Sequence, residues 1–535
     1  MKSASQIMRE LVAVQSDTGT TLEVNVAAKI LELIKEDEYF RANPDLCGAY
    51  QDDDALGRPV VWALKRGSSA RTLIISGHYD CVETQCYGPL QEYALNPDSL
   101  KNLMKENSTT DEQLRRDLED DNWVFGRGTA DMKGGLAAAL FALRSWPGGE
   151  VNVLFTAVSD EENLSAGARQ AVGLYADLKN RFGLDYRLCV ICESCRRNPE
   201  KDDPFPFASG GPGKILPIVL VKGELAHSCD VLGGLNSALI MAEVIKNVEL
   251  SPDFLSVDGD VSTQPPATQL ARDLKEHYDV SLPQYSAAAF NMTFLTSTDP
   301  MDLISRLRKV CVRSIETVIA RYNQVFDTMK NRGLLSREKK AWTVPPTMTL
   351  EELRSSVLQK KAAFKEFEEH LRRRTAQRLS AGQTLQEASV AYLKEIVEFA
   401  DITPPAVVIG VAPPYYGAVS NDRLGWDSAQ FLSSIQPNLQ RLHGIRMVEA
   451  SYATAMTDMS YMSCVDPQSA QQVMNNMALP SGIYDIDFAG IAEMNIPTLL
   501  IGPAGRDIHQ AAERVYLPDV ERNVPEILLE IMKTL

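Results

Sequence analysis

Short apolar runs that alternate with helical segments constrain the fold of the first part of this chain most strongly. Residues 71–77 (RTLIISG), 151–158 (VNVLFTAV) and 187–192 (RLCVIC) are apolar, and each has the length of a buried strand. The segment 131–146 (DMKGGLAAALFALRSW) has the pattern of a helix. Strands that alternate with helices predict an α/β domain with helices on both faces of a sheet.

Side chains that bind metal ions follow these runs. In an open α/β sheet, ligands bind beyond the carboxyl ends of the strands. A carboxylate at the start of the predicted helix would also be favoured by the helix dipole. We therefore expect these side chains to meet in one crevice and to hold two divalent cations around a shared carboxylate. The residues at these positions are His78, Asp131, Glu161, Glu162, Glu193 and, after a further apolar run at 497–502, His509.

The chain also shows where this domain is interrupted. The Gly/Pro-rich stretch 207–215 (FASGGPGKI) predicts a linker or hinge. We expect catalytic residues 1–212, an inserted α+β domain at 213–348, a helical insertion at 349–402 and a second catalytic piece at 403–535. The charged helical insertion predicts a solvated helical hairpin packed on its neighbour, with a partner-binding arm as the alternative.

Two motifs carry a specific resemblance. The segments GHYDCV, which contains His78, and GRGTADMKGG, which contains Asp131, are similar to signatures of a di-zinc peptidase and deacylase family. That family includes aminoacylase, carboxypeptidase G, acetylornithine deacetylase (ArgE) and succinyl-diaminopimelate desuccinylase (DapE). Residues 451–463 and 502–515 resemble its RocB-type arginine-utilisation branch. The resemblance implies a zinc-peptidase-like mixed sheet flanked by helices, with an inserted lid domain.

The resemblance also implies a role for each metal-binding side chain. Asp131 would bridge two metal ions, His78 and Glu193 would complete one site, and Glu162 and His509 would complete the other. Imidazole and carboxylate ligands suit Zn²⁺, and Co²⁺ or Mn²⁺ could replace it in such sites.

Three further residues would take part in catalysis by the same resemblance. Glu161 would be the general base, and Asp80 would accept a hydrogen bond from the second ring nitrogen of His78 and so fix its tautomer. His227, in KGELAHSCD, would stabilise the tetrahedral oxyanion from the inserted domain, which would close like a lid. The Asp131–Met132 peptide bond is expected to be cis.

These roles predict hydrolysis of an amide bond in an N-acyl amino acid or a short peptide, with a link to arginine or amino-acid catabolism. The alternative is a protein that binds metal without catalysis and acts through its helical insertion as a binding or regulatory member of the family. A base such as Glu161 favours the enzyme, because a binding protein does not need one.

Composition limits the other classes of function. The formal net charge of −17 disfavours nucleic acid and anionic membrane surfaces as partners. The amino-terminal segment lacks the continuous apolar region of a secretory signal, and no run is long enough to cross a membrane. The nine cysteines are better explained as reduced thiols than as a disulfide framework. We therefore expect a cytoplasmic protein, and a lid of this kind allows a homodimer.

Overall fold

The computed structural model divides the chain into two compact units, which we describe separately. It describes residues 1–106, 109–345 and 347–535. Unit 1 comprises Met1–Gly211, Val419–Val465 and Ala489–Leu535, and unit 2 comprises Pro212–Ala418 and Asp466–Phe488.

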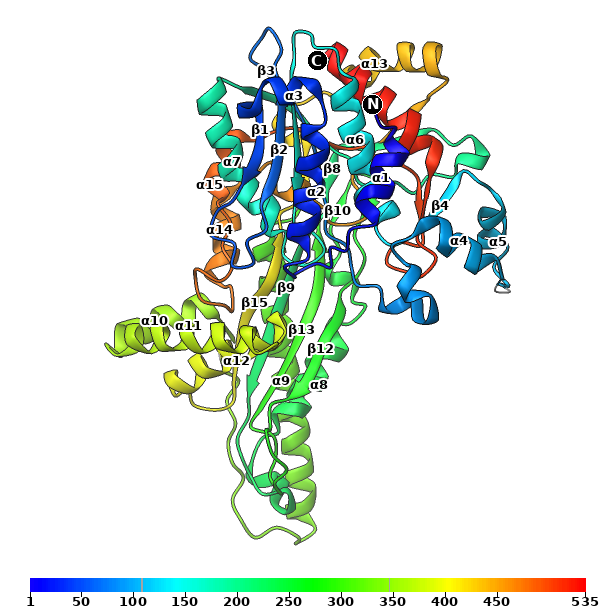
Figure 1. Ribbon diagram of the computed structural model, residues 1–535. Coiled ribbons are helices and arrows are strands. Elements are labelled where there is room, and N and C mark those ends of the chain that lie inside the picture. The colour runs from blue at the N-terminus through cyan, green and yellow to red at the C-terminus, as the bar shows by residue number, and fades with distance from the viewer. Residues whose placement is uncertain (107–108, 346) are drawn as a thin grey trace. The chain divides into compact units, whose positions relative to one another are not determined.

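Unit 1 is built on an eight-stranded mixed sheet (Figure 1). Strand β3 is parallel to both β5 and β6, and β6 is parallel to β18, so the carboxyl ends of these four strands lie at one edge of the sheet. The outer pair β1 and β2 is antiparallel, and β7 is antiparallel to β18. The strands, in spatial order, are β1 (Cys47–Tyr50), β2 (Val60–Lys65), β5 (Asn152–Val158), β3 (Arg71–His78), β6 (Asp185–Ile191), β18 (Thr498–Leu500), β7 (Phe205–Ala208) and β17 (Met447–Ala450).

Helices cover both faces of this sheet, as the sequence predicts. Helix α6 (Gly134–Ser145) packs on β3 and β5, with α1 (Ala4–Val12) and α16 (Val524–Thr534) beside it. On this face Gly77 lies against Met132. The neighbouring Ser76 points to the opposite face, where Thr156 bonds both Ser76 and the Tyr175 hydroxyl of α7 (Ala166–Phe182). Figure 1 likewise shows α6 and α7 on different sides of the sheet.

Small residues let the backbone approach closely where the ligands are placed. A Cβ atom at Gly135 of α6 would lie 1.8 Å from the backbone carbonyl oxygen of Cys192. A Cβ atom at Gly502 would lie 2.0 Å from the backbone carbonyl oxygen of Glu193. Because neither position has room for a Cβ, glycine is required at both. The segment that carries Glu193 is thus held between α6 and the chain that follows β18.

Unit 1 also contains two smaller sheets. One has three strands in the order β19-β20-β4, and the other pairs β16 with β8. The remaining elements are α2 (Glu23–Lys35), α3 (Glu38–Ala42), α4 (Pro97–Glu106), α5 (Glu112–Glu119), β4 (Trp123–Phe125), β8 (Gly210–Gly211), β16 (Val419–Ser420), α13 (Ser428–His443), most of α15 (Phe488–Met494), β19 (Gly505–Arg506) and β20 (Arg514–Tyr516).

Unit 2 is an α+β unit around a five-stranded sheet of order β12-β13-β9-β15-β14. The three helices α10, α11 and α12 share a buried apolar core with strands of this sheet, including Leu371, Ile396 and Leu220. The elements of this unit are β9 (Gly213–Lys222), α8 (Ser237–Val248), β10 (Val257–Asp258), β11 (Val261–Ser262), β12 (Ala267–Asp273), β13 (Tyr285–Phe294), α9 (Pro300–Asn331), β14 (Thr347–Thr349), α10 (Leu350–Lys360), α11 (Phe364–Ser380), α12 (Leu385–Ala400), β15 (Ala406–Tyr416) and α14 (Pro467–Asn475).

The mixed α/β architecture is confirmed, but three of the expected boundaries are corrected. Strand β15 pairs along its length with β9, so the first unit resumes at Val419 and not at residue 403. Residues 349–402 form three helices within unit 2, where a hairpin was expected. The chain also returns to unit 2 at 466–488. Gly210 and Gly211 lie in β8, where a loop was expected, although the boundary between the units does follow them.

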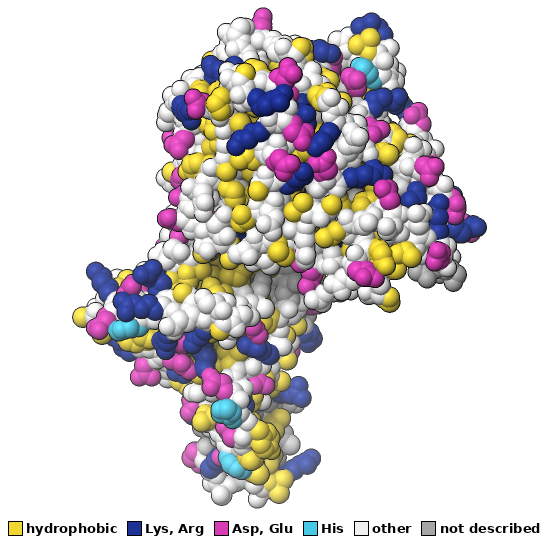
Figure 2. Space-filling model, in the orientation of Figure 1, with side chains coloured by type: hydrophobic (Ala, Val, Ile, Leu, Met, Phe, Trp, Pro, Cys, Tyr) yellow, Lys and Arg dark blue, Asp and Glu magenta, His cyan; other side chains and the backbone are white. Residues whose placement is uncertain are grey.

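The surface carries both signs of charge. On the face shown in Figure 2, basic and acidic side chains are interspersed, and neither sign forms a broad area of its own. Across the described ranges, no helix is both long enough and apolar enough to cross a membrane. The cysteines, described in full, are all free thiols.

Candidate metal centre

The first group of candidate ligands lies where two parallel strands end. His78 is the last residue of β3, and Glu193 follows β6 by two residues. Because Ser76 is in register with Ile191, both side chains reach the same edge of the sheet. His78 Nε2 lies 2.8 Å from Asp131 Oδ1 and 3.6 Å from Glu193 Oε2.

The second group shares Asp131 with the first. Glu162 belongs to the loop after β5, and His509 belongs to the loop between β19 and β20. His509 Nε2 lies 2.8 Å from Glu162 Oε1 and 3.2 Å from Asp131 Oδ2. Asp131 therefore turns one oxygen to each histidine. The Asp131–Met132 peptide bond is cis, as the resemblance implies.

The spacing of these atoms fits divalent metal ions. Within each group of three, all the candidate ligand atoms lie within 4.8 Å of one another. Two ligand atoms in tetrahedral positions about 2.1 Å from Zn²⁺ would be about 3.4 Å apart. The distances from Nε2 of the two histidines to the carboxylate oxygens run from 2.8 to 3.6 Å and include that value. Each metal position would have one histidine, one carboxylate of its own and the shared carboxylate of Asp131. This set of nitrogen and oxygen donors suits Zn²⁺, Co²⁺ or Mn²⁺.

The electrostatics of the centre also favour cations. Burial, together with the charge of Asp131, raises the pKa of Glu193 to about 8 and that of Glu162 to about 7. The pKa of His509 rises to about 10 because its ring bonds to the Asp131 and Glu162 carboxylates. Burial alone would lower the pKa of His78, but its acidic neighbours raise it well above the usual value. These raised pKa values show that the protein's own positive charge compensates the ionised forms of Glu193 and Glu162 only in part, and metal ions would supply the missing positive charge.

Asp80 connects the first histidine to the neighbouring loop. His78 Nδ1 lies 3.0 Å from the Asp80 backbone carbonyl oxygen and 3.4 Å from its carboxylate. The Asp80 carboxylate also accepts hydrogen bonds from the backbone N–H groups of Glu161 (3.1 Å) and Glu162 (3.2 Å). The predicted contact with His78 is thus present, with the carbonyl nearer than the carboxylate. The bonds to the loop were not foreseen, because they depend on the fold.

Glu161 lies beside the two groups without belonging to either. Burial raises its pKa well above the usual value, and the charges of Asp458, Glu162 and Glu193 add to this. The loop that carries it is tightly held. Asp160 has a left-handed backbone (φ 65°), and its carboxylate pairs with buried Arg58. A non-glycine residue in this conformation costs on the order of 1–3 kcal/mol, which the bonds around it must offset.

The sequence profile of peptidase family M20/M25/M40 matches residues 103–533. The chain belongs to this family. It is 29% identical to YqjN of Bacillus subtilis strain 168 over 98% of this chain and 94% of that protein. It is 26% identical to RocB of the same organism over 95% of this chain and 90% of that protein. The structure of the M20 family metallo-carboxypeptidase Sso-CP2 from Sulfolobus solfataricus matches with a TM-score of 0.52 at 12% identity, over 100% and 99% of the two chains.

The predicted lid histidine of this M20/M25/M40 family member lies in unit 2. His227 is exposed, at the start of a short 3-10 helix, and its Nδ1 accepts a hydrogen bond from the Cys229 N–H (3.1 Å). All five candidate metal ligands lie in unit 1. A contribution of His227 to the centre therefore stays a prediction.

Asp458 and Arg506 lie in the two segments, 451–463 and 502–515, that resemble the RocB-type branch. Asp458 is 5% exposed, burial raises its pKa to about 7, and its charge acts on Glu161. The guanidinium of Arg506 lies 2.7 Å from both oxygens of Asp117 and stacks 4.3 Å over the Trp123 ring. Arg506 is thus engaged in packing within unit 1, whereas Asp458 belongs to the acidic surroundings of the candidate base.

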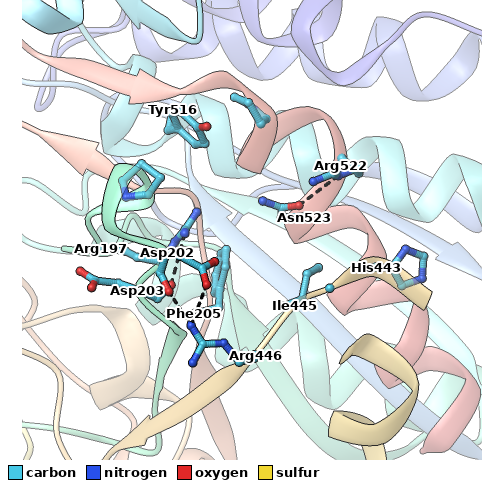
Figure 3. A pocket seen from close by; sticks show the side chains of 13 residues that line it. Arg197, Asp202, Asp203, Phe205, His443, Ile445, Arg446, Tyr516, Arg522 and Asn523 are labelled. Atoms are coloured by element: carbon cyan, nitrogen blue, oxygen red, sulfur yellow. Dashed lines mark hydrogen bonds and ion pairs between the residues drawn. The ribbon is translucent and has the colours of Figure 1, made fainter. Parts of the chain in front are cut away.

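A separate hollow of about 190 Å³ in unit 1 is lined by polar side chains (Figure 3). No candidate metal ligand lines it. Its three arginines have partners within the protein, and two of these partners are carboxylates, which offset the positive charge that an anionic ligand would need. These pairs are Arg197 with Asp519, Arg446 with Asp202, and Arg522 with Asn523.

Proposed function

We propose that this family member is a two-metal hydrolase of amide bonds, with His78 and Glu193 on one ion, Glu162 and His509 on the other, and Asp131 on both. Zn²⁺ is the metal that we propose, with Co²⁺ or Mn²⁺ as substitutes. When bound, such ions supply Lewis-acid polarisation of a carbonyl group and of the attacking water.

The protein's own groups would move the proton. The Glu161 carboxylate takes a proton from the attacking water and delivers it to the leaving nitrogen. Asp80 contacts Nδ1 of the His78 ring and accepts a hydrogen bond from the backbone N–H of Glu161. The same residue therefore positions both a metal ligand and the base. His227 would donate a hydrogen bond to the oxyanion after unit 2 closes.

One observation supports hydrolysis above simple metal binding. Glu161 is a partly buried acid with a raised pKa beside the ligands, yet it lies outside both groups of three. A structural metal site needs no additional buried acid, and burying one is unfavourable. A catalytic site does need such a group. The alternative, a family member that binds metal and regulates or binds a partner through α10–α12, would leave Glu161 without a purpose.

The substrate that we propose is an N-acyl amino acid or a short peptide. The link to arginine or amino-acid catabolism that the sequence resemblance implies makes N-acyl-arginine one member of the test panel. We also propose a cytoplasmic protein that needs neither nucleic acid nor membrane, and a homodimer as the assembly to test by light scattering.

The decisive experiment combines metal content with turnover. Purified protein is loaded with Zn²⁺, its metal content is measured by mass spectrometry, and it is assayed on N-acetyl, N-succinyl and dipeptide substrates. Glu161→Gln should keep two metal ions and lose about 10²–10⁴-fold in kcat, the range for general base catalysis.

A matched control is Glu530→Gln. Glu530 is a buried glutamate of unit 1, and its carboxylate accepts a hydrogen bond from Asn438 (2.7 Å), which is not a candidate ligand. This variant should keep its activity. Full activity in Glu161→Gln would refute the mechanism, and two bound metals with no turnover on the whole panel would favour the regulatory alternative.

A further inference from the structure

A buried glutamate, Glu513, contacts the backbone of the shared ligand. It precedes strand β20, and its side chain is fully buried. Oε1 of Glu513 accepts hydrogen bonds from the backbone N–H groups of Ala130 (3.1 Å) and Asp131 (3.2 Å). Oε2 accepts from Nη1 of Arg127, whose side chain is 2% exposed. Glu513 lies in the segment 502–515, but no local pattern assigns it a role, because its partners are more than 380 residues away in the chain.

The same residue belongs to the hairpin that carries His509. Strands β19 and β20 pair through Gly505 with Val515 and Arg506 with Arg514, and His509 lies in the loop between them. Glu513 closes that loop and bonds to the turn that holds Asp131. One side chain therefore links the two segments whose ligand atoms, His509 Nε2 and Asp131 Oδ2, lie 3.2 Å apart.

Arg127 fixes which oxygen of Glu513 faces the peptide N–H groups. Its second nitrogen, Nη2, donates to Cys86 Sγ (3.0 Å), and its guanidinium stacks 5.3 Å over the Tyr87 ring. Its own backbone N–H donates to the Ala94 carbonyl (2.9 Å). A guanidinium held by Cys86 and Tyr87, on a backbone anchored at Ala94, leaves the glutamate one arrangement in which both of its oxygens are bonded.

We infer that Glu513, oriented by Arg127, is a positioning residue that sets the distance between Asp131 and His509 and thereby the geometry of the second metal site. This inference rests on the proposed two-metal centre. Residues that orient metal ligands typically contribute about 10–100-fold in metal affinity. Glutamine at this position could bond the N–H groups or face Arg127, but its amide cannot accept from both sides as a carboxylate does.

The test uses the metal alone as the probe. Zn²⁺ affinity of the full chain is measured by calorimetry in competition with a chelator, and the visible absorption of the Co²⁺-loaded protein reports ligand geometry. Glu513→Gln should weaken the second, looser Zn²⁺ equilibrium by about 10–100-fold and change the Co²⁺ spectrum. At saturating metal, kcat should fall while KM stays nearly constant, since Glu513 is placed away from the substrate.

Asp519→Asn is the matched control. Asp519 is also a fully buried acid of unit 1, pairs with Arg197 and accepts a backbone N–H, that of Ala504 (2.9 Å). Its contacts do not include a ligand of the centre, so its variant should lose stability without a change in Zn²⁺ affinity or Co²⁺ spectrum. Unchanged affinity and spectrum in Glu513→Gln would overturn the inference.

Arg127→Lys gives a second route if Glu513→Gln does not fold. The lysine keeps the positive charge but lacks the planar guanidinium that bonds two partners at once. We therefore expect the Co²⁺ spectrum to change and the second Zn²⁺ equilibrium to weaken by about 10-fold. A normal second Zn²⁺ equilibrium and a normal Co²⁺ spectrum in this variant would also overturn the inference. These readings need no turnover, so a wild-type chain that binds two metals and hydrolyses nothing would refute the proposed function and still test Glu513.

Discussion

The two candidate ligand groups share Asp131 but differ in the surroundings of their histidines. The His78 side chain is 1% exposed at the end of a central strand, and its second ring nitrogen is bound by Asp80. The His509 side chain is 46% exposed and sits in a loop, with a left-handed backbone (φ 65°). The comparison indicates one rigid, buried site and one site near solvent that a hairpin completes. We expect the buried site to bind its ion more tightly and the open site to exchange its ion more readily.

The largest effect should come from the residue that the two sites share. Asp131→Asn removes the charge that faces both histidines, so we expect the protein to lose both metal ions and at least about 10³-fold in kcat/KM. Metal content by mass spectrometry and an assay on the proposed substrates would measure this. Retention of one full equivalent of tightly bound Zn²⁺ would contradict a shared ligand.

Removal of each histidine should separate the two sites. In metal-free protein, His78→Ala leaves the carboxylates of Asp131, Asp80 and Glu193 without their buried partner, so we expect a loss of about 3–5 kcal/mol in the free energy of unfolding. His509→Ala should cost below about 1 kcal/mol, because its ion pairs are half exposed.

Urea denaturation of chelator-treated protein would compare these two variants. Each should also lose one equivalent of Zn²⁺. His443→Ala, which removes a half-buried histidine paired with Glu526, is the control for the loss of an imidazole. Equal destabilisation by His78→Ala and His509→Ala would contradict the distinction between a buried site and an open site.

Asp80 tests whether the buried and open sides are coupled. Asp80→Asn keeps an oxygen near His78 but cannot accept from both Glu161 and Glu162, so both sides should be disturbed. We expect a loss of about 10–100-fold in Zn²⁺ affinity. A titration that resolves two equilibria should show both of them weakened, and an effect on the tighter one alone would confine Asp80 to the His78 side.

The smallest effect is a pH dependence in the metal-free protein. The raised pKa values of Glu193 (about 8) and His509 (about 10) mean that the folded state keeps protons that the unfolded state has lost. Stability should therefore fall as pH rises, from about 4.5 to 8 for Glu193 and from about 6.5 to 10 for His509.

The slope should stay below about 1 kcal/mol per pH unit for Glu193 and far below it for His509, because solvent screens the ion pairs of the half-exposed His509 side chain. It is measured by denaturation with and without chelator. Zn²⁺ should raise the melting temperature more at pH 8 than at pH 5.5, because it replaces these protons. Above pH 8 only the His509 part should remain, and His509→Ala should remove it. A metal-free protein that becomes more stable from pH 6 to pH 8 would contradict the assignment.

The sequence was sufficient to predict which candidate ligands lie together and insufficient to predict their supports. His78, Glu162 and Glu193 follow apolar runs, so local pattern and sheet geometry were enough to bring them together. Glu513 and the bonds that Asp80 makes to the loop depend on segments far apart in the chain, which no local pattern reveals. The boundaries failed for a related reason, because an apolar strand such as β15 fits either sheet equally well. The break between α10 and α11, at 361–363, contains neither glycine nor proline, so the sequence does not indicate that a helix ends there.

The place of β18 in the sheet has a consequence for how this protein is made. Strand β18 fills the middle of the unit 1 sheet, between β6 and β7, yet it is synthesised long after both. Until residues 498–500 leave the ribosome, β6 and β7 present open edges that favour pairing with other chains. His509 follows only after that strand. A nascent chain of this protein therefore gains its complete ligand set and the continuous sheet of unit 1 in nearly the same step, so metal uptake would report that this sheet has formed.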